Sequence, residues 1–193
     1  MIKALIFDFA GVIGSEGYSL WAKEQKAKGI ESNSTFFGDI SDNMDRGDIS
    51  TQVFSQEVAK VVGIASSDVW KEIYQRIKIN HELLDIIVKL KKKYKIGLLT
   101  NYSDVWMKEL IFEYKLDKYF DSMVISSLHK VIKPEKKIYQ ISLKQLKIKP
   151  EEAVFFDDRP RNVNGGEVAG IKSFLFTTNE KLKEDLESFG VEI

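Results

Sequence analysis

Four groups of polar side chains in this 193-residue chain follow apolar segments and have the types needed for chemistry on a phosphorylated compound. In chain order they are Asp8, Thr100-Asn101, Lys133 and Asp157-Asp158. They supply a carboxylate nucleophile, a hydroxyl donor, an ammonium group and an acidic pair. Phosphoryl transfer needs this set, because it depends on an in-line nucleophile and on cations and donors around the transferring oxygens.

The three aspartates would repel one another if they lay close together without a cation. The chain has no cysteine, so a metal would be bound by oxygen atoms or by the two histidines. We expect His81 to cap a helix and His129 to lie in a loop, which leaves the oxygens. Oxygen-only ligands favour Mg²⁺.

The apolar segments before these side chains have the features of strands buried on both faces. Continuous apolar runs of this length are typical of such strands, and we expect strands at 4–9, 96–100, 122–125, 153–156 and 173–177. Helical spacing alternates with the later strands, at 105–114, 136–146, 163–169 and 180–189. This order predicts an α/β fold, a parallel sheet with helices on both faces. The carboxyl ends of parallel strands share one edge, so the four polar groups should meet there.

Residues 15–80 interrupt this alternation, because they contain no convincing strand. Helical patterns run over 20–28, 51–62 and 67–79, and Ser50 and Ser67 are candidate N-caps for the last two. We therefore expect a core formed by 1–14 and 81–193, with 15–80 as a helical cap above the strand ends. Within the cap, the charged turn 45–48 could face the cleft, which makes Arg46 a candidate substrate contact.

Composition restricts the partners. Lys and Arg together number 29 and Asp and Glu together 29, so no overall field favours nucleic acid or an anionic membrane. No apolar stretch approaches the roughly 18 residues that span a bilayer. We expect a cytoplasmic protein that acts on a small molecule, as a monomer or weak dimer.

Four sequence motifs give the chain a family resemblance. They are Asp8-Phe9-Ala10-Gly11-Val12, the Thr100 of LLTN, the Lys133 of IKPEKKIY and the Asp157-Asp158 of FFDDRPRN. In these motifs the chain resembles the haloacid dehalogenase superfamily, in particular its small capped phosphatases, a branch that includes sugar-phosphate phosphatases and the N-terminal phosphatase of epoxide hydrolase. The resemblance implies a Rossmann-like core with a small helical cap inserted after strand one.

The resemblance also implies a mechanism and a role for each residue. Asp8 would attack phosphorus and form an aspartyl-phosphate that water hydrolyses. Mg²⁺ would be held by Asp8, the backbone carbonyl of Ala10 and Asp158, with Asp157 bound directly or through water. Thr100, Asn101 and Lys133 would bind the phosphoryl oxygens, and Asn162 would orient the acidic loop. The expected activity is Mg²⁺-dependent hydrolysis of a small phosphorylated metabolite, with a sugar phosphate as the favoured substrate.

Ala10 departs from the family pattern, which usually has an acid at this position. General acid–base help of about 10²- to 10⁴-fold would then be missing from its usual place. Glu16 or a substrate hydroxyl could supply the proton, the enzyme could be slow except with good leaving groups, or the chain could bind a phosphometabolite with little turnover. A haloacid dehalogenase is a less favoured alternative, because that branch lacks the metal and the acidic pair.

Overall fold

The computed structural model describes residues 1–30 and 35–191 and contains a parallel sheet. Its strands are β1 (Ala4–Phe7), β2 (Lys95–Thr100), β3 (Ser122–Ile125), β4 (Ala153–Asp157) and β5 (Lys172–Leu175). Their spatial order is β3-β2-β1-β4-β5, and every neighbouring pair is parallel. The central strand β1 is buried throughout and pairs with β2 and β4, so Phe7 lies in register with Leu98 and Phe156. The predicted α/β fold class is confirmed.

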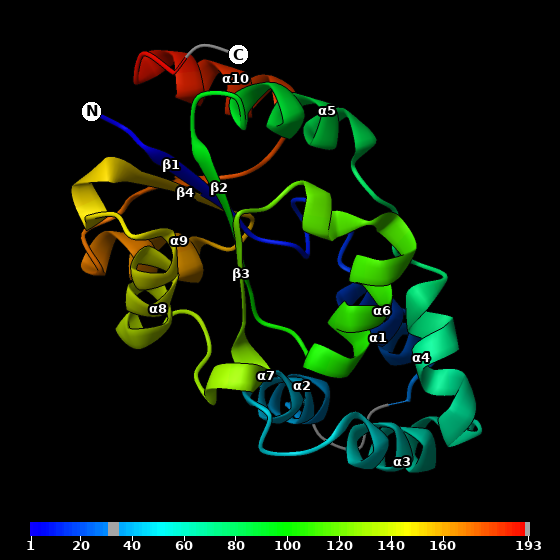
Figure 1. The fold of residues 1–193 in the computed structure, drawn as a ribbon. Coiled ribbons are helices and arrows are strands. Elements are labelled where there is room, and N and C mark those ends of the chain that lie inside the picture. Colours follow the sequence, from blue (N-terminus) through cyan, green and yellow to red (C-terminus); the bar gives the residue numbers. More distant parts are fainter. Residues whose placement is uncertain (31–34, 192–193) are drawn as a thin grey trace.

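Helices cover both faces of the sheet (Figure 1). Side chains alternate along β1, because Leu5 and Phe7 pack into one apolar cluster while Ala4 and Ile6 pack into the other. The first cluster includes residues of α5 (His81–Leu90), α6 (Asp104–Tyr114) and α10 (Asn179–Ser188). The second is covered by α8 (Lys136–Leu146), and α9 (Pro160–Val168) packs against β4 and β5. Two short 3₁₀ helices, Leu116–Lys118 and Pro150–Glu152, complete the core.

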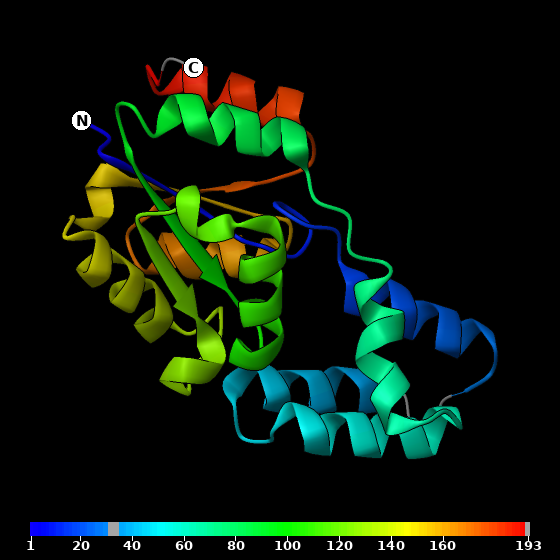
Figure 2. The ribbon, with the colours of Figure 1, turned by 45° about the vertical axis from the view of Figure 1, so that its right-hand side comes forward.

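Between β1 and α5 the chain forms a helical insertion, which extends to one side of the sheet (Figure 2). It consists of α1 (Gly17–Ala27), α2 (Phe36–Arg46), α3 (Thr51–Val62) and α4 (Ser66–Tyr74). Its core is built from Trp21, Phe37, Phe54 and Val69 and extends to Trp106 of α6. The end of α2 packs against α7 (Ser126–His129). The cap bounds of 15–80 stay a prediction, and residues 31–34 of that range lie outside the described residues.

The insertion differs from the sequence prediction in its second helix. The sequence pattern predicts a turn at 45–48, but α2 continues through Arg46 and ends at Gly47, whose φ of 77° lies in the left-handed region. Among the predicted caps, Ser50 accepts a hydrogen bond from the amide of Val53. The prediction for Ser67 is wrong, because α4 begins one residue earlier, at Ser66.

The prediction for His81 is also wrong, because Asn80 caps α5 by accepting a hydrogen bond from the amide of Leu83.

Of the helices in residues 1–30 and 35–191, none has the length and apolar character needed to cross a membrane.

Candidate active site

The turn after β1 presents Asp8 at the edge of the sheet. The amide of Asp8 donates to the carbonyl of Phe156 at 2.9 Å, which continues the β1–β4 ladder, and the amide of Phe9 donates to Asp8 Oδ1 at 2.6 Å. The chain then turns at Gly11, which has a φ of +83°. A Cβ atom at Gly11 would lie 2.4 Å from the carboxyl carbon of Asp158. The turn therefore requires glycine both for its backbone conformation and for the close approach of Asp158.

Gly11→Ala is expected to lower the free energy of unfolding by about 1–3 kcal/mol, because it adds backbone strain and displaces the Asp158 carboxylate. Urea unfolding measures this loss. Gly63→Ala is the matched control, because Gly63 has a φ of +77° but no atom within 4 Å of the position that a Cβ would take, so it isolates the cost of the backbone conformation. Equal losses in the two variants would show that the contact with Asp158 adds no constraint.

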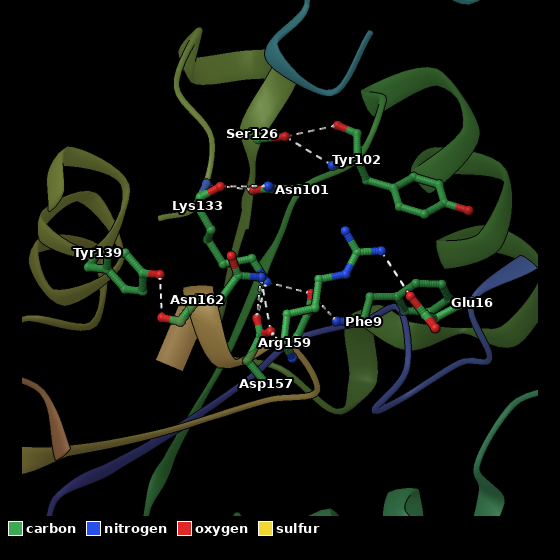
Figure 3. Close-up of polar contacts among 11 residues, drawn as sticks. Phe9, Glu16, Asn101, Tyr102, Ser126, Lys133, Tyr139, Asp157, Arg159 and Asn162 are labelled. Atoms are coloured by element: carbon green, nitrogen blue, oxygen red, sulfur yellow. Dashed lines mark hydrogen bonds and ion pairs between the residues drawn. The ribbon is translucent and has the colours of Figure 1, made fainter. Parts of the chain in front are cut away.

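Lys133 connects the ends of three strands. Its side chain is fully buried, and Nζ lies 2.8 Å from Asp8 Oδ1 and 2.5 Å from Asp157 Oδ2. Asn101 holds the Lys133 backbone, because the Lys133 amide donates to Asn101 Oδ1 at 2.7 Å and Asn101 Nδ2 donates to the Lys133 carbonyl at 3.0 Å (Figure 3). Asn101 is thus a positioning residue for Lys133, and its predicted contact with phosphate stays a prediction.

The two members of the acidic pair have different surroundings. The Asp157 carboxylate is buried and accepts hydrogen bonds from Lys133 Nζ, from Asn162 Nδ2 at 2.9 Å and from the amide of Arg159 at 2.9 Å. Asn162 is itself held by Tyr139, whose hydroxyl donates to the Asn162 carbonyl at 2.7 Å. Among the described residues, the buried Asp158 Oδ1 has no hydrogen-bond partner. Asp157 is committed to positioning Lys133, whereas Asp158 has a free oxygen.

The geometry of the three carboxylates fits a divalent cation. One oxygen from each of Asp8, Asp157 and Asp158 can lie within 4.8 Å of the others. The group combines three carboxylates with one ammonium, so the ionised cluster carries an excess of negative charge. A hard cation bound by oxygen would balance that charge and satisfy the free Asp158 oxygen.

The pKa shifts follow from this crowding. Burial, with a smaller contribution from Asp157, raises the pKa of Asp8 to about 8, although Lys133 opposes the shift. Burial and then Asp157 raise the pKa of Asp158 to about 6. Burial acts to lower the pKa of Lys133, but the charges of Asp157 and Asp8 outweigh burial, so the pKa lies above its usual value and the ammonium stays charged. Burial is the first cause of both raised pKa values, and the neighbouring carboxylates add to it.

The Thr100 side chain is buried at the end of β2, and its Oγ1 has no hydrogen-bond partner among the described residues. The hydroxyl is therefore free to donate to a ligand. Ala10, whose carbonyl is a predicted metal ligand, lies at the same edge and lines a cavity beside Asp8. The four sequence-predicted groups are brought together, and their roles stay predictions.

This cavity has a volume of about 70 Å³ and lies between the sheet edge and the insertion. Besides Asp8 and Ala10, its lining includes Asn101, Lys133, Arg159, Asn162, Tyr102 and Trp106 from the core and Glu16, Tyr18, Ser19, Ser41, Met44 and Asp45 from the insertion side. Glu16, a candidate substrate contact, does reach the cavity. Arg46 does not line it, because its guanidinium pairs with Glu135 at 2.6 Å, and this placement does not support its predicted contact.

Asp45 belongs to the segment 45–48 that was expected to face the cleft, but Arg46, rather than Asp45, was named as the candidate substrate contact. Ser41 and Asp45 are four residues apart and therefore lie on one face of α2, whereas Arg46 lies about 100° further round the helix axis. Recognition of α2 as a helix would have placed Asp45, rather than Arg46, beside Ser41.

A family model described as haloacid dehalogenase-like hydrolase matches residues 22–176. The chain belongs to this family. The predicted superfamily is thereby confirmed, and the chain is a hydrolase whose named relatives are phosphatases. The match begins after the turn that holds Asp8 and Ala10, so the assignment of these two residues depends on the geometry described above.

Two relatives of this haloacid dehalogenase-like hydrolase are sugar-phosphate or related phosphatases. It is 33% identical over 103 residues to glyceraldehyde 3-phosphate phosphatase of Pyrococcus furiosus, covering 52% of this chain and 43% of that protein. It is 25% identical over 190 residues to D-ribitol-5-phosphate phosphatase of Bacteroides thetaiotaomicron, covering 90% and 91% of the two chains. The aligned segment therefore spans less than half of the first relative and nearly all of the second.

The fold is shared with a solved structure. A HAD family enzyme variant from Bacteroides thetaiotaomicron, crystallised with magnesium and inorganic phosphate, superposes with a TM-score of 0.78 at 23% identity, covering 93% of this chain and 96% of that one. This likeness supports the Rossmann-like fold class.

Proposed function

We propose that this hydrolase is a Mg²⁺-dependent phosphatase that acts on a small phosphorylated metabolite through an aspartyl-phosphate on Asp8. The observation that carries the proposal is the placement of Asp8 in a small cavity, 2.8 Å from the buried ammonium of Lys133 and beside the free oxygen of Asp158. A nucleophile, a fixed cation and a set of metal ligands thus meet at one point.

The residues of the chain have separate tasks in this mechanism. Asp8 Oδ attacks phosphorus in line with the leaving oxygen, and water then attacks the aspartyl-phosphate. Lys133 neutralises charge on the nucleophile and on the phosphoryl oxygens, and the free hydroxyl of Thr100 donates to those oxygens. Asp8, Asp158 and the carbonyl of Ala10 would hold Mg²⁺, with Asp157 acting mainly through Lys133. The bound ion supplies positive charge that offsets the three carboxylates and the phosphate.

The cavity and the relatives support a small sugar phosphate as the substrate. Polar groups such as Ser19, Ser41 and Asn101 could bind hydroxyl groups of the substrate, while Met44 and Trp106 provide apolar surface. Two relatives are named for phosphorylated three-carbon and five-carbon compounds. We further propose that the insertion acts as the cap, and that the protein is cytoplasmic and works as a monomer or weak dimer.

A binding-only function is the second candidate, and Ala10 favours it because the usual acid is missing. A dehalogenase has less support. The haloacid dehalogenases lack the acidic pair, whereas here Asp157 and Asp158 form one cluster of carboxylates with Asp8.

Phosphate release from a panel of phosphorylated sugars and from nitrophenyl phosphate tests the proposed function, with Mg²⁺ and with a chelator. We expect release from one or a few sugar phosphates, and we expect the chelator to remove it because the ion offsets the carboxylate charge. Returning Mg²⁺ after the chelator should restore the rate, which controls for irreversible damage. No release from any compound would leave binding as the function, and equal release with chelator would contradict the metal requirement.

A further inference from the structure

The leaving oxygen of a phosphate ester needs a proton, and the methyl group of Ala10 cannot supply one. Among the described residues, the carboxyl groups that line the cavity besides Asp8 are those of Glu16 and Asp45. If the proposed function holds, the proton donor is Glu16, Asp45 or a hydroxyl group of the substrate.

The Glu16 carboxylate forms an ion pair with Arg159. Its Oε1 accepts a hydrogen bond from Arg159 at 2.8 Å (Figure 3). The same oxygen accepts a second hydrogen bond from the Ser19 hydroxyl at 3.1 Å. An ion pair with a guanidinium requires the ionised carboxylate, and an ionised carboxylate has no proton to give. Glu16 is therefore placed to hold Arg159 at the rim of the cavity.

Asp45 reaches the cavity from the last turn of α2. The same helix buries Phe37, Ile40 and Met44 in the core of the insertion, which orients the neighbouring stripe of Ser41 and Asp45 toward the sheet edge. The residue is partly buried, and no ion pair shorter than 4 Å to its carboxylate is found among the described residues. Its carboxyl group is thus free to interact with a ligand.

The end of α2 is fixed to the core next to Asp45. The Ser126 hydroxyl donates to the Asp45 carbonyl, and Ser126 Oγ accepts from the amide of Tyr102 at 2.9 Å. Lys130, four residues after Ser126, donates to the carbonyl of Gly47. A Cβ atom added at Gly47 would lie 2.7 Å from the Ser127 carbonyl oxygen. These contacts join α2 to α7 and the residue after it, which follow β3, and through Ser126 to Tyr102, two residues beyond the end of β2 at Thr100. Asp45 is therefore held in place relative to the strand ends.

We propose that Asp45 is the general acid of the first step and the general base of the second. As Asp8 Oδ forms its bond to phosphorus, the bond to the leaving oxygen breaks and that oxygen takes the Asp45 proton, which gives an alcohol and an Asp45 carboxylate. Water then attacks phosphorus and gives a proton to Asp45, while the bond from phosphorus to Asp8 breaks. Inorganic phosphate leaves, and both aspartates return to their starting forms.

The charges around Asp45 suit this task. Burial, reinforced by Asp42 on the same helix, raises the pKa of Asp45 to about 7. The groups that oppose this shift from the core are Arg159, Lys133 and Arg161. The facing phenols of Tyr18 and Tyr102 have pKa values raised first by burial and then by Asp45, so they stay neutral. Protonated Asp45 is present below about pH 7 and is lost as the pH rises through that value.

Asp45→Asn tests the proposal, with Asp48→Asn as the matched control, because Asp48 is exposed in the following turn and does not line the cavity. We expect Asp45→Asn to lower kcat/KM, which reports the first step alone, by about 10²-fold or more with a sugar phosphate, since an alkoxide is a poor leaving group. With nitrophenyl phosphate, whose leaving group needs no proton, the loss should be at most about tenfold. Equal losses on both substrates, or no loss on either, would overturn the proposal.

The pH profile of the wild-type protein is a second test, and it does not require the variant to fold. With the sugar phosphate, kcat/KM should fall above about pH 7, and this fall should be absent with nitrophenyl phosphate. The same fall with both substrates, or none with the sugar phosphate, would overturn the assignment of Asp45. If the wild-type protein releases no phosphate from any compound, the proposed function fails and this inference with it. Turnover that does not depend on Asp45 overturns this inference alone.

Discussion

Asp8→Asn is expected to abolish phosphate release, with kcat lowered on the order of 10⁵-fold, because an amide cannot act as the nucleophile. The amide has nearly the same shape and keeps an oxygen that can accept from the Phe9 amide. The variant also removes one of three clustered carboxylates, so the free energy of unfolding should stay the same or rise. Steady-state phosphate release and urea unfolding measure the two effects.

The control for this variant is Asp117→Asn, which removes an exposed carboxylate in the 3₁₀ helix Leu116–Lys118, away from the cavity. It should keep the rate of the wild-type protein. Undiminished Mg²⁺-dependent hydrolysis by Asp8→Asn would contradict the aspartyl-phosphate mechanism. The urea unfolding curve shows whether an Asp8→Asn protein that releases no phosphate is still folded.

Lys133→Met is expected to lower the free energy of unfolding by about 3–5 kcal/mol and to remove turnover, because a buried ion pair loses its only cation. Methionine retains most of the apolar stem, but Asp8 and Asp157 would lose an ammonium at 2.8 and 2.5 Å. The destabilisation should be greatest above the raised pKa values of Asp8, about 8, and Asp158, about 6. It should shrink as the pH falls through them, because protonation removes the uncompensated charge.

Urea unfolding at mildly alkaline and mildly acidic pH measures this dependence. Lys136→Met is the control, because Lys136 is exposed at the start of α8, three residues from Lys133. We expect a change within about 0.5 kcal/mol for the control, as for most surface substitutions. A loss for Lys133→Met that does not depend on pH would show that packing, rather than charge, is the main contribution of this side chain.

The sheet could be predicted from the sequence because its strands are buried on both faces and therefore read as continuous apolar runs. Segment 122–125 was located as observed, while the predicted strand 4–9 ends two residues too late, since β1 ends at Phe7 and Phe9 belongs to the turn. Phe9 is buried as completely as the strand residues, so hydrophobicity alone could not separate strand from turn.

The candidate site could be predicted as a group of residue types because parallel strands deliver their carboxyl ends to one edge. The hydrogen-bond partners within this group could not be predicted from the sequence. Nothing local in the sequence shows that Asn101 binds the Lys133 backbone or that Asp157, and not Asp158, receives three hydrogen bonds. Within the segment 45–48, Arg46 was chosen instead of Asp45, because the side that faces the cavity depends on how α2 packs against α7, a contact between segments about 80 residues apart.

Oxygen exchange between inorganic phosphate and water enriched in the heavy oxygen isotope tests the central claim most directly, because it does not require the natural substrate. Reversible formation of an aspartyl-phosphate from Asp8 and phosphate releases water and exchanges the phosphate oxygens. The account predicts Mg²⁺-dependent exchange by the wild-type protein, detected by mass spectrometry of the phosphate, and none by Asp8→Asn. Exchange that persists in Asp8→Asn, or a wild-type protein that hydrolyses phosphate esters without any exchange, would contradict it.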